Sequence, residues 1–241
     1  MKSDDLQRMQ AGFDDPVLHS QVVFRRALQA LSMPGRIVDL PQLDSVPKNG
    51  HIASALLLLA LVDSDCALWF SPSLAGSDSQ AWLRFHTGCR FVQEPSQANF
   101  LWLRAGDPWP LLSEMQVGSD EYPDQSATCI METSGLQTGV ENQVWSLTGP
   151  GIAAPMGLTA KGLPADFAAQ WAGNHAAFPR GVDVFLTSTA QVMGLPRSTV
   201  LRQFEVLEPK CTYPSKAGKP QSLTVTTCLR SSGAVTKQCL S

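Results

Sequence analysis

The sequence predicts an α/β fold, in which helices pack on a layered β-sheet. Two apolar patterns alternate along the chain up to about Glu208. One repeats every three or four residues, as in amphipathic helices, and the other consists of short continuous runs, as in buried strands. Their alternation predicts an α/β layered sheet. A chain of 241 residues can form one large domain or two small ones, and it shows no internal repeat.

The first helix is predicted to start in the segment Asp14-Asp15-Pro16 and to end before Pro34. Aspartate is a good N-cap, proline is tolerated at the first helical position, and Pro34 with Gly35 stops the helix. Five residues then recur at helical spacing: Val17, Gln21, Phe24, Leu28 and Leu31. This spacing predicts that Phe24 faces the core, with Arg25 on the flank of the helix and Arg26 on its far side.

Further elements follow from the same patterns. An apolar helix is expected at residues 52–61, and a helix at residues 164–174 should bury Phe167 and Trp171. Capping-box spacing at residues 77–80 predicts a helix with Trp82 and Phe85 in the core and Gly88 at its left-handed end. Strands are expected at residues 37–40, 67–70, 99–103, 127–131, 144–147 and 182–186, and in the run before Leu195. The Thr-Gly-Pro-Gly run at residues 148–151 is interpreted as a strand-end turn rather than a phosphate cradle, because proline lacks an amide donor.

Charge divides the chain into a body, residues 1–208, and a tail, residues 209–241. The tail has five basic residues and no acidic ones, which leaves 13 basic and 21 acidic residues in the body, a net charge of −8. We therefore expect a polar, basic tail of low order and no nucleic-acid partner for the chain. The alternative is that the tail touches its own body, a partner or RNA.

Composition also limits the compartment and the chemistry. The N-terminus lacks an export signal, and the apolar run at residues 52–62 is too short for a bilayer, so we expect a cytoplasmic protein without a membrane partner. The six cysteines form no C-x-x-C pair, which argues against a metal site, and Cys66, Cys89 and Cys129 have the apolar surroundings of buried thiols.

Charged residues make up only 16% of the chain, so a cation at the end of an element is expected to have a partner. The arginines could clamp phosphate or carboxylate, contact another subunit or form intrachain ion pairs, and Arg26 is the best interface candidate. His86 could cap its helix, contact a partner, bind a ligand or transfer a proton, and the Thr87 hydroxyl could bind phosphate or backbone. The candidate ligand or interface residues are Arg25, Arg26, Arg84, His86, Thr87 and Arg197.

Pyridoxal phosphate requires a Schiff-base lysine, a carboxylate for the pyridine nitrogen and donors for the phosphate. In the body, lysine occurs only at Lys2, Lys48 and Lys161, and Lys161 stands in an apparent glycine-rich loop. We expect no bound cofactor, no metal and no catalytic residue.

A series of short sequence motifs along the chain resembles the family of H subunits of the bacterial carbon–phosphorus lyase core complex. The motifs lie, in order, at residues 12–17, 24–28, 32–35, 69, 85–87, 122–128, 147–152, 178–183 and 195–197. The basic tail and Arg90, where relatives often carry proline, depart from the family pattern.

This resemblance implies a three-layer α/β/α sandwich similar to the large domain of pyridoxal-phosphate-dependent transferases, without the cofactor. It also implies a homodimer that joins G, I and J subunits in phosphonate catabolism. The G, H, I and L subunits together convert ATP and a phosphonate into ribose 1-phosphonate 5-triphosphate with loss of adenine. The chain is therefore expected to be a complex subunit that is not catalytic by itself. The alternative is a small-molecule enzyme acting on a phosphorylated substrate through a pocket of His86 and arginines, which requires these side chains to converge.

Overall fold

A computed structural model describes residues 12–41, 47–139 and 144–203 of the chain. All of these residues belong to one compact unit, Met1–Glu205. The predicted tail at residues 209–241 lies outside the described residues.

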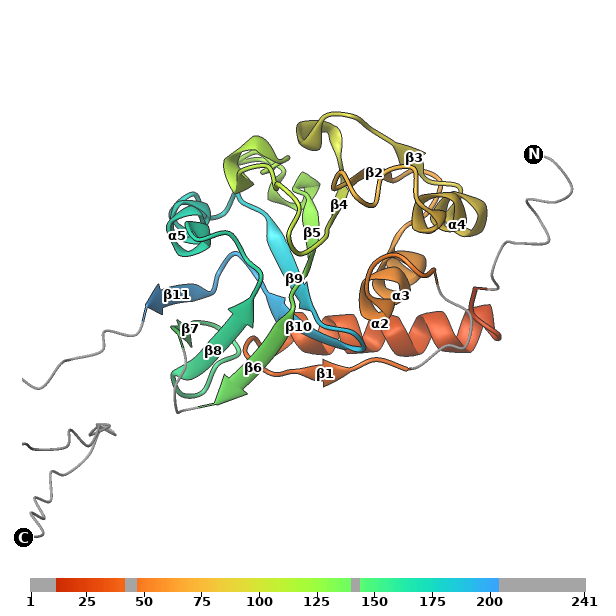
Figure 1. The fold of residues 1–241 in the computed structure, drawn as a ribbon. Coiled ribbons are helices and arrows are strands. Elements are labelled where there is room, and N and C mark those ends of the chain that lie inside the picture. Colours follow the sequence, from red (N-terminus) through yellow and green to blue (C-terminus); the bar gives the residue numbers. More distant parts are fainter. Residues whose placement is uncertain (1–11, 42–46, 140–143, 204–241) are drawn as a thin grey trace, which may run out of the picture. The chain divides into compact units, whose positions relative to one another are not determined.

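The centre of the fold is a mixed seven-stranded sheet with the order β1-β10-β9-β5-β4-β2-β3 (Figure 1). The strands from β9 to β3 are parallel to one another, and β10 is antiparallel to both of its neighbours. The seven strands are β1 (Val38–Asp39), β2 (Ala67–Phe70), β3 (Arg90–Phe91), β4 (Phe100–Leu103), β5 (Thr128–Glu132), β9 (Asp183–Thr187) and β10 (Gln191–Leu195). The apolar runs expected from the sequence form six of these strands, and β3 is additional.

A second, four-stranded antiparallel sheet has the order β11-β7-β8-β6. Its strands are β6 (Gly135–Gly139), β7 (Trp145–Thr148), β8 (Met156–Lys161) and β11 (Val200–Gln203). The apolar pattern indicated β7 alone, because glycines at both ends of β6 and within β8 obscure the strand signal. The prediction that Lys161 stands in a loop was wrong, since it is the last residue of β8.

Within the described residues, four α-helices accompany the two sheets, together with three short 3₁₀ turns. They are α2 (Pro16–Ser32), α3 (Ile52–Leu61), α4 (Asp78–Thr87) and α5 (Phe167–Ala176). Asp15 caps α2 as predicted, because its Oδ1 accepts hydrogen bonds from the amides of Val17 and Leu18, both at 3.0 Å. Ser77 is the N-cap of α4 but makes no side-chain cap bond, so the expected capping box is not formed.

The two faces of the large sheet are covered by different secondary-structure elements (Figure 1). Alternate strand residues such as Trp102 and Ile130 pack with α2, α3 and α4. Their neighbours, such as Leu101 and Met131, pack with α5 and the small sheet. The layer on the second face is therefore a helix together with a four-stranded sheet. Phe167 and Trp171 of α5 are both buried there, as expected.

The predicted core face of α2 was wrong. Phe24 and Leu28 are 45% and 51% exposed, whereas Val23, Ala27 and Ala30 are buried. Helical spacing alone cannot distinguish these two faces, because both are apolar. Phe85 of α4, also expected in the core, is 50% exposed.

A glycine explains why small residues of α2 face the sheet. A Cβ at Gly194 of β10 would lie 2.5 Å from the carbonyl carbon and oxygen of Ala30. The helix backbone thus rests directly on the strand backbone, and large side chains do not fit between them.

Gly194→Ala is expected to destabilise the protein by about 1–3 kcal/mol, because the added methyl group must push α2 away from β10. Gly173→Ala is the matched control. Its Cβ would meet nothing within 4 Å in α5, and alanine favours helix over glycine by up to about 1 kcal/mol. Urea unfolding of both variants measures the difference, and equal stability of Gly194→Ala and wild type would contradict the close contact.

Candidate functional site

The structure places the six candidate residues in three separate regions. Arg25 and Arg26 lie on α2, the residues from Arg84 to Thr87 lie at the end of α4, and Arg197 follows β10. Five strand spacings separate β10 from β3, the strand that follows α4. At about 4.8 Å per strand, the two regions are about 24 Å apart. Arg197 therefore does not share a site with the candidates on α4.

Thr87 and Gly88 close the C-terminal end of α4. The Thr87 hydroxyl donates to the carbonyl oxygen of Leu83 at 2.8 Å and accepts from the amide of Cys89 at 3.2 Å. Gly88 has a φ of 72° and donates its amide to the carbonyl of Arg84. The hydroxyl thus binds backbone, which is the second alternative considered from the sequence.

His86 packs among rings and backbone at the same helix end. Its ring centroid lies 5.0 Å from those of Trp82 and Phe85. A Cβ at Gly12 would stand 3.0 Å from its Nδ1, so the chain segment before α2 lies against the imidazole. The guanidinium carbon of Arg84 stacks 4.7 Å from the ring centroid of Phe91, a cation–π contact.

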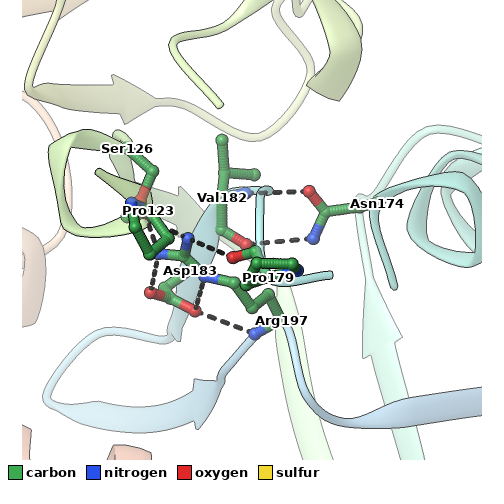
Figure 2. A network of polar contacts seen from close by, with 7 residues as sticks. All are labelled: Pro123, Ser126, Asn174, Pro179, Val182, Asp183 and Arg197. Carbon is green, nitrogen blue, oxygen red and sulfur yellow. Dashed lines mark hydrogen bonds and ion pairs between the residues drawn. The ribbon is translucent and has the colours of Figure 1, made fainter. Parts of the chain in front are cut away.

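Arg197 is the centre of a polar network that joins distant parts of the chain (Figure 2). Its Nε and Nη2 donate to Oδ1 and Oδ2 of Asp183 at 3.2 and 2.6 Å, a bidentate pair. Nη1 donates to the carbonyls of Pro123 and Pro179 at 2.8 and 3.2 Å, and Nη2 also donates to the hydroxyl of Ser126. The five donors of the guanidinium thus have five acceptors within the chain. The intrachain ion pair considered from the sequence is the one observed.

The end of α5 is attached to the same region. The Asn174 side chain exchanges two hydrogen bonds with the backbone of Val182, at 2.8 and 3.0 Å (Figure 2). Nδ1 of His175 lies 3.0 Å from the carbonyl oxygen of Arg197. Sequence reasoning named Arg197 but missed Asn174 and did not assign Asp183 as a partner, since their pairing across the chain leaves no local pattern.

The carboxyl ends of the parallel strands hold a second polar cluster. Glu132, which is 2% exposed, accepts from Trp102 Nε1 at 2.8 Å and from the amide of His51 at the start of α3. Burial by itself would raise the pKa of Asp78, but hydrogen bonds from the Asn49 side chain and from backbone amides lower it overall. These carboxylates order the chain before α3.

The described lysines do not fit a pyridoxal phosphate site. Lys48 and Lys161 are both exposed, so neither provides an enclosed amine for a Schiff base. The expectation of no cofactor stays a prediction.

Two cavities, of about 360 and 330 Å³, lie along α5. They share Leu111 and Gln170 in their walls, and neither is lined by any of the six candidate residues. The convergence of His86 and arginines that the enzyme alternative requires is not found in either cavity.

Metal and thiol chemistry find little support within residues 12–41, 47–139 and 144–203. No group of three His, Cys, Asp or Glu side chains there could hold a metal ion. Cys89 and Cys129 are buried, and burial raises the pKa of both thiols. In the same residues, no helix is both long and apolar enough to cross a membrane.

Comparison with known proteins identifies the family. The family model for the bacterial phosphonate metabolism protein PhnH matches residues 11–202. The chain belongs to the PhnH family. It is 36% identical over 191 residues to the alpha-D-ribose 1-methylphosphonate 5-triphosphate synthase subunit PhnH of Rhizobium meliloti (strain 1021), covering 79% of this chain and 94% of that protein. It is 33% identical over 179 residues to the putative C-P lyase subunit protein HtxG of Stutzerimonas stutzeri, covering 74% of this chain and 84% of the relative.

The Arg197 network gives a physical role to several of the short sequence motifs that resemble the PhnH family. Three of these motifs contain residues of the network: Pro123 and Ser126, Pro179 and Asp183, and Arg197 itself. In this PhnH-family chain, residues of the three motifs contact one another through the Arg197 guanidinium. These motif residues therefore have a structural role.

Arg197→Lys is expected to destabilise the protein by about 2–4 kcal/mol, because an ammonium has three donors and cannot reproduce the planar five-donor geometry. Arg180→Lys is the control, because the side chains of the Arg180–Asp120 ion pair are 47% and 79% exposed. This substitution should change the free energy of unfolding by less than about 0.5 kcal/mol. Urea unfolding checks both. A similarly small change in the free energy of unfolding for both variants would contradict the proposed contribution of the network to stability.

Proposed function

We propose that this chain is an H subunit of the carbon–phosphorus lyase core complex in organic phosphonate catabolism. It would support the formation of ribose 1-phosphonate 5-triphosphate from ATP and a phosphonate, with release of adenine. The observation that carries this proposal is the 36% identity that extends over 94% of the Rhizobium meliloti synthase subunit. The match of the PhnH family model to residues 11–202 supports it independently.

The contacts of the candidate residues support a role that is not catalytic by itself. The Arg197 guanidinium is fully used by intrachain acceptors. The Thr87 hydroxyl is bonded to backbone, and Arg84 is stacked on Phe91. A catalytic group needs a polar atom directed at a substrate, and these side chains direct theirs into the fold.

The assembly that we propose is a homodimer that joins G, I and J subunits in the cytoplasm. The naming of two relatives as complex subunits supports the association with other proteins. We also propose that the fold is related to the large domain of pyridoxal-phosphate-dependent transferases without retaining the cofactor. A sheet of parallel strands with the antiparallel β10 near one edge is compatible with this relationship.

Growth on methylphosphonate as the sole phosphorus source tests the function. A bacterium that lacks its H subunit but retains the other subunits should grow again when it expresses this chain, because the synthase complex is restored. The Rhizobium meliloti relative is the positive control, and an empty vector is the negative control. Failure to grow, with the chain expressed and folded, would contradict the proposal.

The same assay distinguishes the enzyme alternative. If the chain contributes no catalytic group, His86→Ala should support growth whenever the complex assembles, because His86 is held among Trp82, Phe85 and Gly12. An assembled complex with His86→Ala that releases no adenine from ATP would favour the alternative instead.

A further inference from the structure

Helix α2 carries apolar residues on both its buried and its exposed sides. Its core side is formed by Val23, Ala27 and Ala30, which are 0–2% exposed. Five large apolar residues on the remaining surface are 42–77% exposed: Val17, Leu18, Val22, Phe24 and Leu28. The side of a surface helix that faces water usually carries charged and polar residues. The outer side of α2 therefore has the composition of a covered surface.

The charges on α2 are unbalanced. From Pro16 to Ser32 the helix contains Arg25 and Arg26 and no acidic residue. At about 100° per residue, Arg25 points roughly opposite to the buried residues, whereas Arg26 lies on the flank. Arg26 donates to Gln29 of the same helix at 3.2 Å. Arg25 makes no ion pair or hydrogen bond with any described residue, so its charge is available to a carboxylate. Arg25, and not Arg26 as expected from the sequence, is the better interface candidate.

The exposed apolar surface continues beyond the N-terminal end of α2. Gly12, four residues before the helix, lies against the His86 ring, and the Phe85 ring is 5.0 Å from that ring. Phe85 is itself 50% exposed. Since α2 is about 25 Å long, the surface suits a partner element of comparable length.

A second copy of this chain is a poor occupant of this surface. Phe24 is the central residue of α2, so a two-fold antiparallel pairing of two α2 helices would place the Arg25 side chains of both copies near the axis. Neither helix offers a carboxylate to compensate them, and like charges at such a distance repel. A different polypeptide that carries carboxylates beside apolar residues meets both requirements.

We propose that the outer side of α2, with Phe85, docks another subunit of the phosphonate-degrading complex through an apolar surface edged by Asp or Glu. The partner's apolar side chains cover Val17, Phe24 and Leu28, and its carboxylate pairs with Arg25. This inference rests on the proposed function, because it takes the partner from that complex.

The test titrates the full chain against a purified complex of G, I and J subunits by calorimetry. Val17→Asp and Phe24→Glu should each weaken binding at least about tenfold, because they place an unpaired carboxylate in an apolar contact. A negative charge in the first turn of a helix interacts favourably with the helix dipole, so Val17→Asp should leave the melting temperature unchanged. A loss of binding by this variant would then come from the docking surface and not from unfolding. Val144→Asp is the matched control at a valine that is 44% exposed elsewhere, and it should bind like wild type.

The charge is tested separately. Arg25→Glu should weaken binding about three- to tenfold at low salt and less at high salt, since salt screens the pairing. Arg202→Glu, at an exposed arginine on β11, should have no such effect.

Two outcomes would overturn the inference alone. One is wild-type affinity of Val17→Asp and Phe24→Glu for the G, I and J complex. The other is loss of self-association by Phe24→Glu in light scattering with partner binding intact, which would assign the surface to a second copy. If the wild-type chain itself fails to bind the complex, the proposed function is wrong and the docking surface with it.

Discussion

The contact between α2 and β10 determines which surface of the protein is left for others. Gly194 lets the backbone of Ala30 rest on the strand, and this closeness admits only small side chains on the inner side of the helix. The larger ones, Phe24 and Leu28 among them, are then directed outward. The fold buries the small face of α2 and leaves its larger apolar side chains uncovered. A packing constraint inside the monomer thus produces the apolar surface outside it.

The second organising contact is the Arg197 guanidinium. It holds the ends of β9 and β10 to the turn before β5 and to the segment after α5. A single side chain can do this because a guanidinium has five donors in one plane and stays charged at any working pH. Its side chain is 13% exposed and that of Asp183 is 26% exposed, so water competes weakly for the pair.

The sequence predicted the elements better than it predicted their faces. Helix α3 and strand β2 have the expected limits, and the caps at Asp15 and Gly88 are confirmed, because these signals are local. The failures concern contacts with distant partners. The orientation of α2 depends on Gly194, which is more than 150 residues away in the chain. Strands β6 and β8 contain glycines, and their extended backbone depends on their pairing with each other. In the same way, Arg197 could be named as a candidate, but its acceptors could not be assigned from the sequence.

The contacts of Arg197 and Thr87 favour structural roles for these candidate residues. An active site retains polar groups that the fold leaves unpaired, because their partners are atoms of the substrate. Among the candidates, Arg197 and Thr87 are bonded within the chain, whereas the outer side of α2 exposes large apolar residues beside Arg25, which pairs with no residue that the structure describes. An uncovered apolar helix gains free energy by excluding water against a protein surface, which requires no reaction. A protein neighbour over the outer side of α2 would remove this apolar surface from water.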